Sequence, residues 1–293
     1  MTETQKAVCK SKWQLRPNNQ YVPCRSTESR LPTGIYSVWV DFPNMETLFR
    51  RIEQKTDNLI DSREPIAQKV MEEMKQFWDV SDQYRKFGYL HKRGYLFYGP
   101  HGSGKTSIVQ QIVQFVIQND GVIFTVDDPH ALIWGLREYR SIEPDRKTVC
   151  IFEDIDTIVE KREKEGALLQ LIDGETQIDN ILYLATTNYP EKLDKRILSR
   201  PRRFDRVLKV EMPSAVTRQA YFDAKLTPTN GTNIDEWVEA TEGFSFGAMA
   251  ELVINVKCLG IPYEIAIADL KHRQEKKPSS DEFSRGCLGF RDR

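Results

Sequence analysis

The chain has 293 residues, of which 29% are charged and 40% hydrophobic, an ordinary globular composition. Its 42 basic and 43 acidic residues leave a formal net charge of -1, so the overall charge favours neither nucleic acid nor an anionic membrane as a partner. Five widely spaced cysteines without a C-x-x-C pair argue against a disulfide scaffold or a zinc site and fit the cytoplasm. No apolar stretch approaches the about 20 residues of a membrane span, and we expect neither a membrane segment nor a secretion signal.

Residues 1–56 form an N-terminal segment with weak structural signals. Residues 1–33 are polar and look flexible, with six Lys and Arg against two Glu. This basic excess leaves nucleic acid as a possible but less favoured partner. The alternation in GIYSVWVDF (34–42) predicts a strand, and METLFRRI (45–52) could form a helix.

Residues 57–212 show the alternating pattern of an α/β domain. A helix is expected over about 61–80, where apolar residues recur every three or four positions. Short runs that are apolar at every position then alternate with helical patterns, which predicts a parallel sheet buried on both faces. The expected strands are GYLFY (94–98), VIFTV (122–126), TVCIF (148–152), ILYLAT (181–186) and VLKVEM (207–212).

The remainder of the chain is helical in pattern and ends in a charged tail. Residues 213–271 predict a small helical domain. Residues 272–293 combine charges with Pro, Ser and Gly, and predict a mobile tail.

The segment GPHGSGKT (99–106) matches the phosphate-binding pattern G-x-x-x-x-G-K-[ST] and lies between a predicted strand and a predicted helix. Its glycines let backbone amides turn toward an anion, to which the helix N-terminus adds a partial positive charge. Lys105 is expected to reach the β- and γ-phosphates of ATP, and the Thr106 hydroxyl to coordinate Mg²⁺. A glycine-rich turn without a ligand is the plainer alternative, and His101 has the character of a tolerated variable position. The expected nucleotide-binding residues are Gly99, Pro100, His101, Gly102, Ser103, Gly104, Lys105, Thr106 and Ser107.

Two adjacent carboxylates, Glu153 and Asp154, follow the expected strand at 148–152. Ligand chemistry in parallel α/β folds lies at the carboxyl ends of the strands. A phosphoryl-transfer ATPase needs one acid near the metal and one acid to orient the attacking water, and adjacent acids can meet both needs. Helix capping is the alternative, although Thr157 and Glu160 could cap the next helix without them.

Four segments resemble AAA ATPases of the AAA+ superfamily: KRGYLFYGPHGSGKT (92–106), CIFEDID (150–156), ALLQLIDG (167–174) and TTNYPEKLD (186–194). They are most similar to the branch of the mitochondrial chaperone that translocates the Rieske iron–sulfur protein in respiratory complex III assembly. The resemblance covers about 57–260 and implies a P-loop NTPase fold, with a doubly wound five-stranded parallel sheet and a helical lid. That branch also carries the Glu-Asp order, which by register gives Glu153 the metal side and Asp154 the water-orienting side. Its transmembrane helix has no counterpart here, so membrane anchoring and Rieske-protein translocation are not expected.

The same resemblance extends to residues that complete an ATPase site. Asn188 follows the strand at 181–186, where the family places a polar residue that helps to position the lytic water. LSRPRRFDR (198–206) resembles the family's RPGRFDR, so Arg200 and Arg203 match two arginines that reach the γ-phosphate of a neighbouring subunit. Arg202 stands in place of the family glycine, and a solvated basic turn or a nucleic-acid patch is the alternative. Arginines that act in trans imply a homo-oligomeric ring, of six or seven subunits in this family.

Two further resemblances concern the adenine and the substrate. GFSFGAMAEL (243–252) resembles a helix start that packs near the adenine, so Gly247 and Ala248 either contact it or only permit close helix packing. Ile133, Trp134 and Gly135 resemble a central-pore loop that grips polypeptide, with its first two residues exchanged. A buried Trp that anchors a loop is the alternative. The family implies a Mg²⁺- and ATP-dependent motor that remodels or translocates protein substrates. A DNA-metabolism ATPase and a nucleotide-gated scaffold remain the other candidates.

Overall fold

The computed structural model describes most of the chain, in two compact units, Met1–Glu211 and Met212–Arg293. The described residues are 7–16, 20–41, 43, 46–53, 65–174, 176, 178–198, 200, 202–226 and 233–275. The predicted tail lies almost wholly outside them.

The N-terminal segment contains regular structure that its sequence did not indicate. Strands β1 (Ala7–Arg16) and β2 (Gln20–Thr27) pair with each other in an antiparallel hairpin. In the described part of the chain they form a sheet of their own. Both strands lie within residues 1–33, for which no regular structure was predicted.

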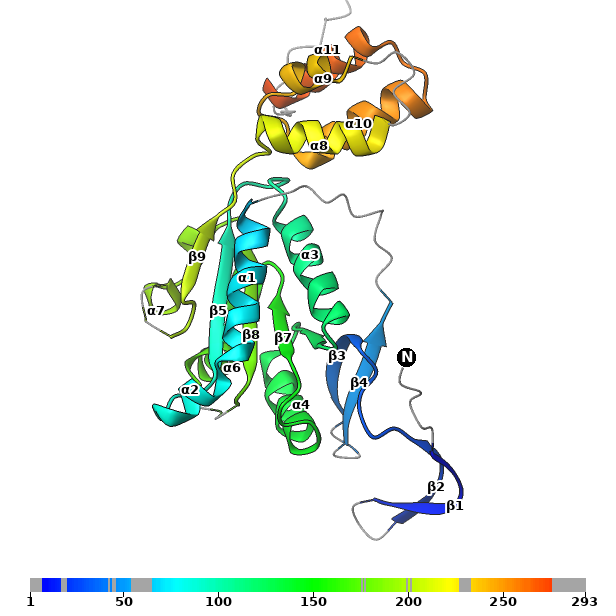
Figure 1. Ribbon diagram of the computed structural model, residues 1–293, viewed down its shortest axis with the longest axis vertical. Helices are drawn as coiled ribbons and strands as arrows, with labels where there is room; N and C mark the ends of the chain where they lie inside the picture. The colour runs from blue at the N-terminus through cyan, green and yellow to red at the C-terminus, as the bar shows by residue number, and fades with distance from the viewer. Residues whose placement is uncertain are drawn as a thin grey trace, which may run out of the picture. The chain divides into compact units, whose positions relative to one another are not determined.

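The main sheet has seven strands, in the order β4-β3-β6-β7-β8-β5-β9. Figure 1 labels these strands except β6, from β9 on the left to β4 on the right. Their bounds are β3 Gly34–Asp41, β4 Glu46–Ile52, β5 Lys92–Tyr98, β6 Val122–Thr125, β7 Thr148–Phe152, β8 Ile181–Thr187 and β9 Arg206–Lys209. Every neighbouring pair is parallel except β3 and β4. The five predicted core strands are β5 to β9, and the strand predicted at 34–42 joins them as β3.

Strand β4 corrects the expectation of a helix over 45–52. Its apolar residues recur at helical spacing, but the segment pairs along its whole length with β3, where Phe49 lies opposite Val38. The Phe49 ring packs 5.9 Å from the ring of Phe124 on β6. Burial of Phe49 against the sheet therefore outweighs the weak helical preference of so short a segment.

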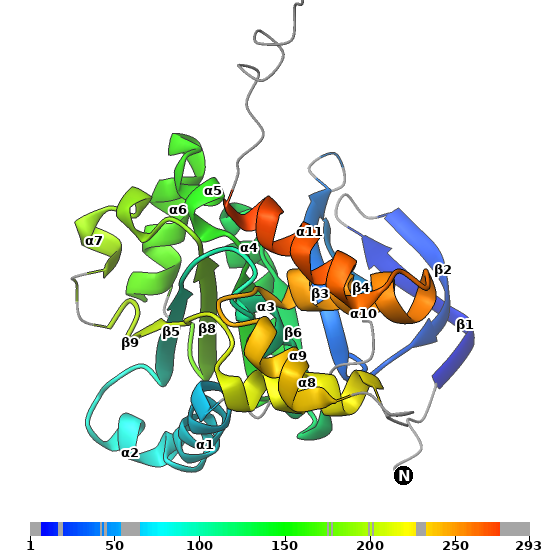
Figure 2. The ribbon, with the colours of Figure 1, turned by 90° about the horizontal axis from the view of Figure 1, so that it is seen from above.

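Helices cover both faces of the sheet, so the predicted doubly wound α/β fold is confirmed (Figure 2). Helices α1 and α3 pack on one face, and α4, α5 and α6 pack on the other. Strands β7 and β8 are buried at every position, as strands covered on both faces must be. The helices are α1 Pro65–Asp79, α2 Ser81–Lys86, α3 Lys105–Gln118, α4 Pro129–Ile142, α5 Ile155–Val159, α6 Arg162–Asp173 and α7 Lys195–Leu198.

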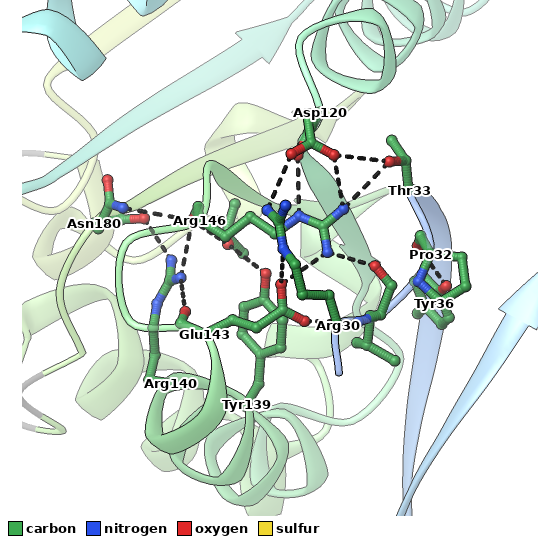
Figure 3. A network of polar contacts seen from close by, with 12 residues as sticks. Arg30, Pro32, Thr33, Tyr36, Asp120, Tyr139, Arg140, Glu143, Arg146 and Asn180 are labelled. Atoms are coloured by element: carbon green, nitrogen blue, oxygen red, sulfur yellow. Dashed lines mark hydrogen bonds and ion pairs between the residues drawn. The ribbon is translucent and has the colours of Figure 1, made fainter. Parts of the chain in front are cut away.

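A network of charged residues holds the N-terminal end of β3 against the parallel strands (Figure 3). The Arg146 guanidinium, 4% exposed, lies 2.8 Å from Glu143 Oε2 and 3.1 Å from Asp120 Oδ1. Arg30 adds a second cation, 3.0 Å from Asp120 Oδ2 and 3.4 Å from Glu143 Oε2. The Leu31 amide donates to Glu143 Oε1 at 2.7 Å. Because these groups belong to the segments that precede β3, β6 and β7, the network holds the added strands against the predicted core.

The C-terminal unit is helical, with a core of aromatic and aliphatic side chains. The rings of Phe222 and Trp237 pack edge to face, with centroids 5.4 Å apart, and Met249 is fully buried. The helices are α8 Ala215–Leu226, α9 Ile234–Ala240, α10 Phe246–Val253 and α11 Tyr263–Glu275, with a wider turn, Ile254–Cys258, after α10. Among the described residues of the whole chain, no helix is long and apolar enough to cross a membrane.

Candidate functional site

The phosphate-binding motif occupies the turn between β5 and α3, and the backbone explains its glycines. Gly102 and Gly104 have φ angles of 74° and 102°, in the left-handed region that glycine adopts without strain. Gly99 is required for a different reason, because a Cβ there would lie 2.1 Å from the carbonyl oxygen of Val210. The chain that follows β9 therefore closes over the start of the loop.

Two side chains in this loop fit an anionic ligand. Lys105 is buried, and its ammonium donates to the carbonyl oxygens of Gly99 at 2.7 Å and Pro100 at 2.8 Å. Burial lowers the pKa of Lys105, and the charge of Asp154 opposes that shift. The Ser103 hydroxyl is buried and has no hydrogen-bond partner within the described chain, an arrangement that calls for a polar ligand. A cationic loop with an unpaired buried hydroxyl suits the phosphates of a nucleotide.

The acids at the end of β7 are held by a left-handed turn. Asp154 has a φ of 46°, which Asp adopts more readily than most residues, and its amide donates to the Thr186 hydroxyl at 3.0 Å. Burial raises the pKa of Glu153, and the carboxylates of Asp154 and Asp127 raise it further. The two acids at this strand end therefore differ in their electrostatic surroundings. Asp154 interacts with the positive charge of Lys105, whereas Glu153 interacts with the negative charges of Asp154 and Asp127.

Asn188 joins this group from the neighbouring strand. Its side-chain amide donates to Asp154 Oδ1 at 3.1 Å. Strand β8 lies between β7 and β5, so the parallel arrangement brings the ends of all three strands to one edge of the sheet. Lys105, Glu153, Asp154 and Asn188, which were predicted from separate motifs, therefore lie together.

A buried hydrogen bond that the sequence reasoning missed supports Asn188. The Thr187 hydroxyl donates to Asp156 Oδ1 at 2.6 Å and accepts from the Tyr189 amide at 3.0 Å. Asp156 and Thr187 are both buried. The signal was present in the sequence, because each residue stands one or two positions from a predicted site residue.

His101 also has a contact that its sequence position did not indicate. Its Nε2 lies 3.1 Å from the Tyr189 hydroxyl, and the two rings meet edge to face with centroids 5.6 Å apart. The Lys192 ammonium lies 4.5 Å from the centre of the Tyr189 ring. His101 thus links the phosphate loop to the residue that follows Asn188.

The two arginines predicted to act as arginine fingers differ in exposure. The Arg200 side chain is 65% exposed and lies 3.4 Å from Asp173 Oδ2. The Arg203 side chain is only 3% exposed, donates through two nitrogens to the Asp173 carboxylate, and bonds the Arg196 carbonyl with the third. Only Arg200 is accessible to a neighbouring molecule without rupture of a buried ion pair.

Arg202, which replaces the family glycine, keeps the backbone of a glycine. Its φ is 68°, in the left-handed region, and its guanidinium lies 5.1 Å from the centre of the Tyr89 ring. The turn is docked on β5, where a Cβ at Gly94 would lie 2.2 Å from the Arg203 carbonyl oxygen. Arg202 therefore leaves the path of the arginine-bearing turn intact.

The predicted pore loop is not a loop. Ile133, Trp134 and Gly135 lie within helix α4. Ile133 is buried in the core, and a Cβ on Gly135 would lie 2.4 Å from the Val38 side chain. Trp134 is 50% exposed, so it is not the buried anchor that was the alternative reading. Contact with a polypeptide from this segment would rest on Trp134 alone.

The remaining predicted residues lie where a ligand could reach them within their own units. Thr106 is exposed in the first turn of α3, next to Ser107. Gly247 and Ala248 open helix α10, where the Ala248 amide donates to the Ser245 hydroxyl at 3.2 Å. A Cβ on Gly247 would meet only that hydroxyl, at 3.8 Å, so close packing within the C-terminal unit does not explain the glycine.

A glycine loop between a parallel strand and a helix, with acids and an amide at the adjacent strand ends, defines a P-loop nucleoside triphosphatase. Residues 95–212 match the family described as "ATPase family associated with various cellular activities (AAA)". The chain therefore carries an AAA-family ATPase domain, as its motifs predicted.

Named relatives agree with this assignment. The chain is 31% identical over 212 residues to an ATP-dependent zinc metalloprotease FtsH of Lancefieldella parvula, an alignment that covers 64% of this chain and 32% of that protein. It is 31% identical over 151 residues to a probable mitochondrial chaperone bcs1 of Schizosaccharomyces pombe, covering 48% and 33%. It is 27% identical over 181 residues to a cell division cycle protein 48 homolog of Archaeoglobus fulgidus, covering 55% and 24%. The chain spans about a third or less of the length of these relatives.

Proposed function

We propose that this chain is a Mg²⁺-dependent ATPase that assembles into a homo-oligomeric ring of six or seven copies and remodels or translocates protein substrates. The observation that carries the proposal is the group formed by Lys105, Asp154 and Asn188 at one edge of the sheet, with Asn188 bonded to Asp154 at 3.1 Å. Phosphoryl transfer depends on positioning and on charge compensation, which a cation, an acid and an amide at adjacent strand ends can supply.

Each residue has a separate task in this proposal. Lys105 exchanges its bonds to the loop carbonyls for the β- and γ-phosphate oxygens of ATP. Asp154 accepts a hydrogen bond from the attacking water and orients it, while Asn188 fixes the Asp154 carboxylate and adds no negative charge. Mg²⁺, held by the Thr106 hydroxyl and by Glu153 or Asp154, would neutralise charge on the phosphates. Gly247 and Ala248 are proposed to contact the adenine.

The decisive variant is Asp154→Asn, because it keeps the size and the hydrogen bonds of the side chain but removes its charge. We expect turnover to fall by about 10²–10⁴-fold, the usual contribution of a positioned acid or base. Binding of a fluorescent ATP analogue should persist. Asp145→Asn is the matched control, since Asp145 is 80% exposed and pairs only with the partly exposed Arg85 on the described surface. Asp145→Asn should keep the turnover of the wild type. Robust turnover by Asp154→Asn would remove Asp154 from the mechanism.

Ring assembly is proposed from Arg200. An exposed guanidinium with one weak partner is free to reach the γ-phosphate bound by a neighbouring copy, where arginine fingers contribute about 10³–10⁵ in rate. Arg203 is proposed to position the turn and not to act directly, because its guanidinium is already bonded to Asp173.

Mixing two inactive variants tests this arrangement. Arg200→Ala lacks the finger but keeps Lys105, and Lys105→Ala lacks the phosphate-binding lysine but keeps Arg200. Each variant alone should be inactive, whereas a mixed ring contains sites with both residues and should recover part of the turnover. An absence of recovery in rings shown to be mixed would contradict an arginine supplied in trans.

A protein substrate is proposed from the relatives, whose names include a chaperone and a metalloprotease. The wide spacing of the cysteines supports a reducing location such as the cytoplasm. Turnover measured with a partly unfolded protein and with single-stranded DNA discriminates the main candidates. Stimulation by DNA alone would favour a DNA-metabolism ATPase.

A further inference from the structure

A cavity of about 330 Å³ lies between the carboxyl-terminal half of β3 and helix α4. Its walls include Val38 and Trp39 of β3, Thr125 and Asp127 at the end of β6, and Ala131 and Trp134 of α4. One side is firmly packed, because Gly135 leaves no room for a Cβ against Val38. The cavity is therefore bounded by regular elements and does not depend on a loop.

Two tryptophans line this cavity, and the side chains of both are exposed to solvent. Trp39 is 58% exposed and Trp134 is 50% exposed. The Trp39 Nε1 donates to the Ser37 hydroxyl at 3.1 Å, and both residues line the cavity. Leu48, which lies opposite Trp39 on β4, is 49% exposed. Large apolar side chains gathered at an opening mark a binding surface more often than a chance exposure.

The charged groups of the cavity are mainly acidic. Asp127 is exposed at the end of β6, which is the parallel neighbour of the strand that Glu153 follows. Asp128 caps α4 by accepting from the His130 amide at 3.1 Å. Lys164 is the nearby cation, but its ammonium donates to the Asp127 carbonyl oxygen at 2.7 Å.

The remaining titratable group of the cavity wall is His130, whose Nε2 lies 3.1 Å from the Glu163 carbonyl oxygen. Its ring is thereby turned toward the main chain of α6. Asp127 and Asp128 are thus the charges that the cavity offers to a ligand beside aromatic surface, and Asp127 is the more exposed of the two.

We propose that this cavity binds an arginine or lysine side chain of a client polypeptide, with Trp134 covering its stem and Asp127 pairing with its charge. An aromatic wall beside carboxylates is the combination that recognises such a side chain, since indole faces attract cations and pack against methylenes. A phosphate-bearing ligand is disfavoured by the same carboxylates. The identification of the bound chain as a client rests on the proposed function.

The position of the cavity gives this contact a consequence for the ATPase. Asp127 follows β6 and Glu153 follows β7, and these strands are parallel neighbours. A client side chain paired with Asp127 therefore lies at the same sheet edge as the acids of the ATPase site. Binding at the cavity is expected to change turnover as well as to hold the client.

Direct binding measurements test the proposal without reliance on turnover. The probe is a short fluorescent peptide of alternating arginine and glycine, titrated with the full chain by fluorescence anisotropy. A peptide with glutamine in place of each arginine is the matched comparison. We expect the arginine peptide to bind, and Trp134→Ala and Asp127→Asn each to weaken it by about tenfold, as for a cation held by an aromatic face and a carboxylate.

Two control variants change similar side chains elsewhere. Phe87→Ala removes an exposed aromatic ring, 68% exposed, and Asp82→Asn removes an exposed carboxylate, 92% exposed. Both should leave peptide affinity within about twofold, as is usual for surface changes. Because Asp127→Asn preserves shape at an exposed position, it keeps the test valid even if Trp134→Ala unfolds.

Several results would overturn the proposal. Equal affinity for the glutamine peptide, or unchanged affinity in Asp127→Asn, removes the cation site. Tighter binding of single-stranded oligothymidine, strengthened by Asp127→Asn, assigns the cavity to nucleic acid. Preferential binding of a peptide with the chain's own residues 1–12 assigns it to the N-terminus. Turnover of the same samples is measured in parallel, so that failure of the ATPase proposal and failure of the cavity proposal are seen separately.

Discussion

The ion pair between Asp173 and Arg203 gives a sharp test of how the arginine-bearing turn is held. The Arg203 side chain is 3% exposed and Asp173 is 16% exposed. Two guanidinium nitrogens bond the carboxylate, and the pair spans 30 positions of sequence, from α6 to the turn before β9. Asp173→Asn keeps the shape of the side chain but leaves the buried guanidinium without its counter-charge.

Removal of one partner from a buried ion pair costs about 3–5 kcal/mol. Asp173 retains some contact with solvent, so we expect the lower end, about 3 kcal/mol. The free energy of unfolding is measured in urea without nucleotide, because a ligand bound to the native state would mask the loss. Hydrogen exchange of the β5 and β8 amides reports this unit separately from the helical unit.

Glu160→Gln is the control, since it breaks a pair with Lys192 in which both side chains are about half exposed, at 55% and 45%. Its cost should stay below about 1 kcal/mol, as for most surface pairs. If Asp173→Asn also changes stability by less than about 1 kcal/mol, the buried pair does not form and the separation of Arg200 from Arg203 is refuted.

The pH dependence of the same variant gives a second check. The hydrogen bonds from Arg203 lower the pKa of Asp173 below its ordinary value, although burial opposes the shift. A carboxyl with a lowered folded-state pKa contributes fully above its unfolded-state pKa, about 3.9, and loses that contribution as the pH falls through the folded value. The stability difference between the wild type and Asp173→Asn should therefore be constant above about pH 5 and shrink below it.

Two further pairs of substitutions probe the phosphate loop and the network at the start of β3. Gly99→Ala should abolish binding of a fluorescent ATP analogue, because its Cβ would lie 2.1 Å from the Val210 carbonyl oxygen. Gly166 has open space around it in helix α6, so Gly166→Ala should bind the analogue normally and gain about 0.5–1 kcal/mol of stability. Arg146→Met should lower the free energy of unfolding in urea by about 3 kcal/mol, because it leaves buried Glu143 without its closest cation. Arg30→Met should lower it by less than about 1 kcal/mol, because the Arg30 side chain is 54% exposed. Equal losses within either pair would contradict the burial on which these expectations depend.

The core strands and the proximity of the candidate site residues were predictable because their signals are local or strictly ordered. Strands buried on both faces must be continuous apolar runs, and the strand end then places whatever follows it at the ligand edge. Glu153, Asp154 and Asn188 each follow such a run, so their convergence needed no knowledge of side-chain contacts. The order of the motifs along the chain supplied the rest.

The errors arose where a weak local pattern competed with tertiary structure or with a stronger local signal. Residues 45–52 have helical spacing, but the open edge of β3 and the burial of Phe49 made them a strand. At 133–135 a resemblance of three residues was preferred to the helix start just before it, where Asp128 caps α4 and Pro129 occupies its first turn. No sequence pattern could show that Asp173 forms an ion pair with Arg203, because that contact joins segments that only the folded sheet brings together.

The network in Figure 3 and the cavity lie toward opposite ends of β3, and this explains why the cavity can be specific. Arg146, Glu143 and Asp120 fix the entrance of the strand, and the contact between Gly135 and Val38 fixes its middle against α4. The walls are thus formed before a ligand arrives, so little free energy is lost in ordering them and more of the contact energy appears as affinity. A ligand that enters meets aromatic surface and carboxylates in a fixed arrangement. Arg146→Met should therefore weaken peptide binding although Arg146 lies outside the cavity, whereas a cavity formed by induced fit would not respond to that distant change.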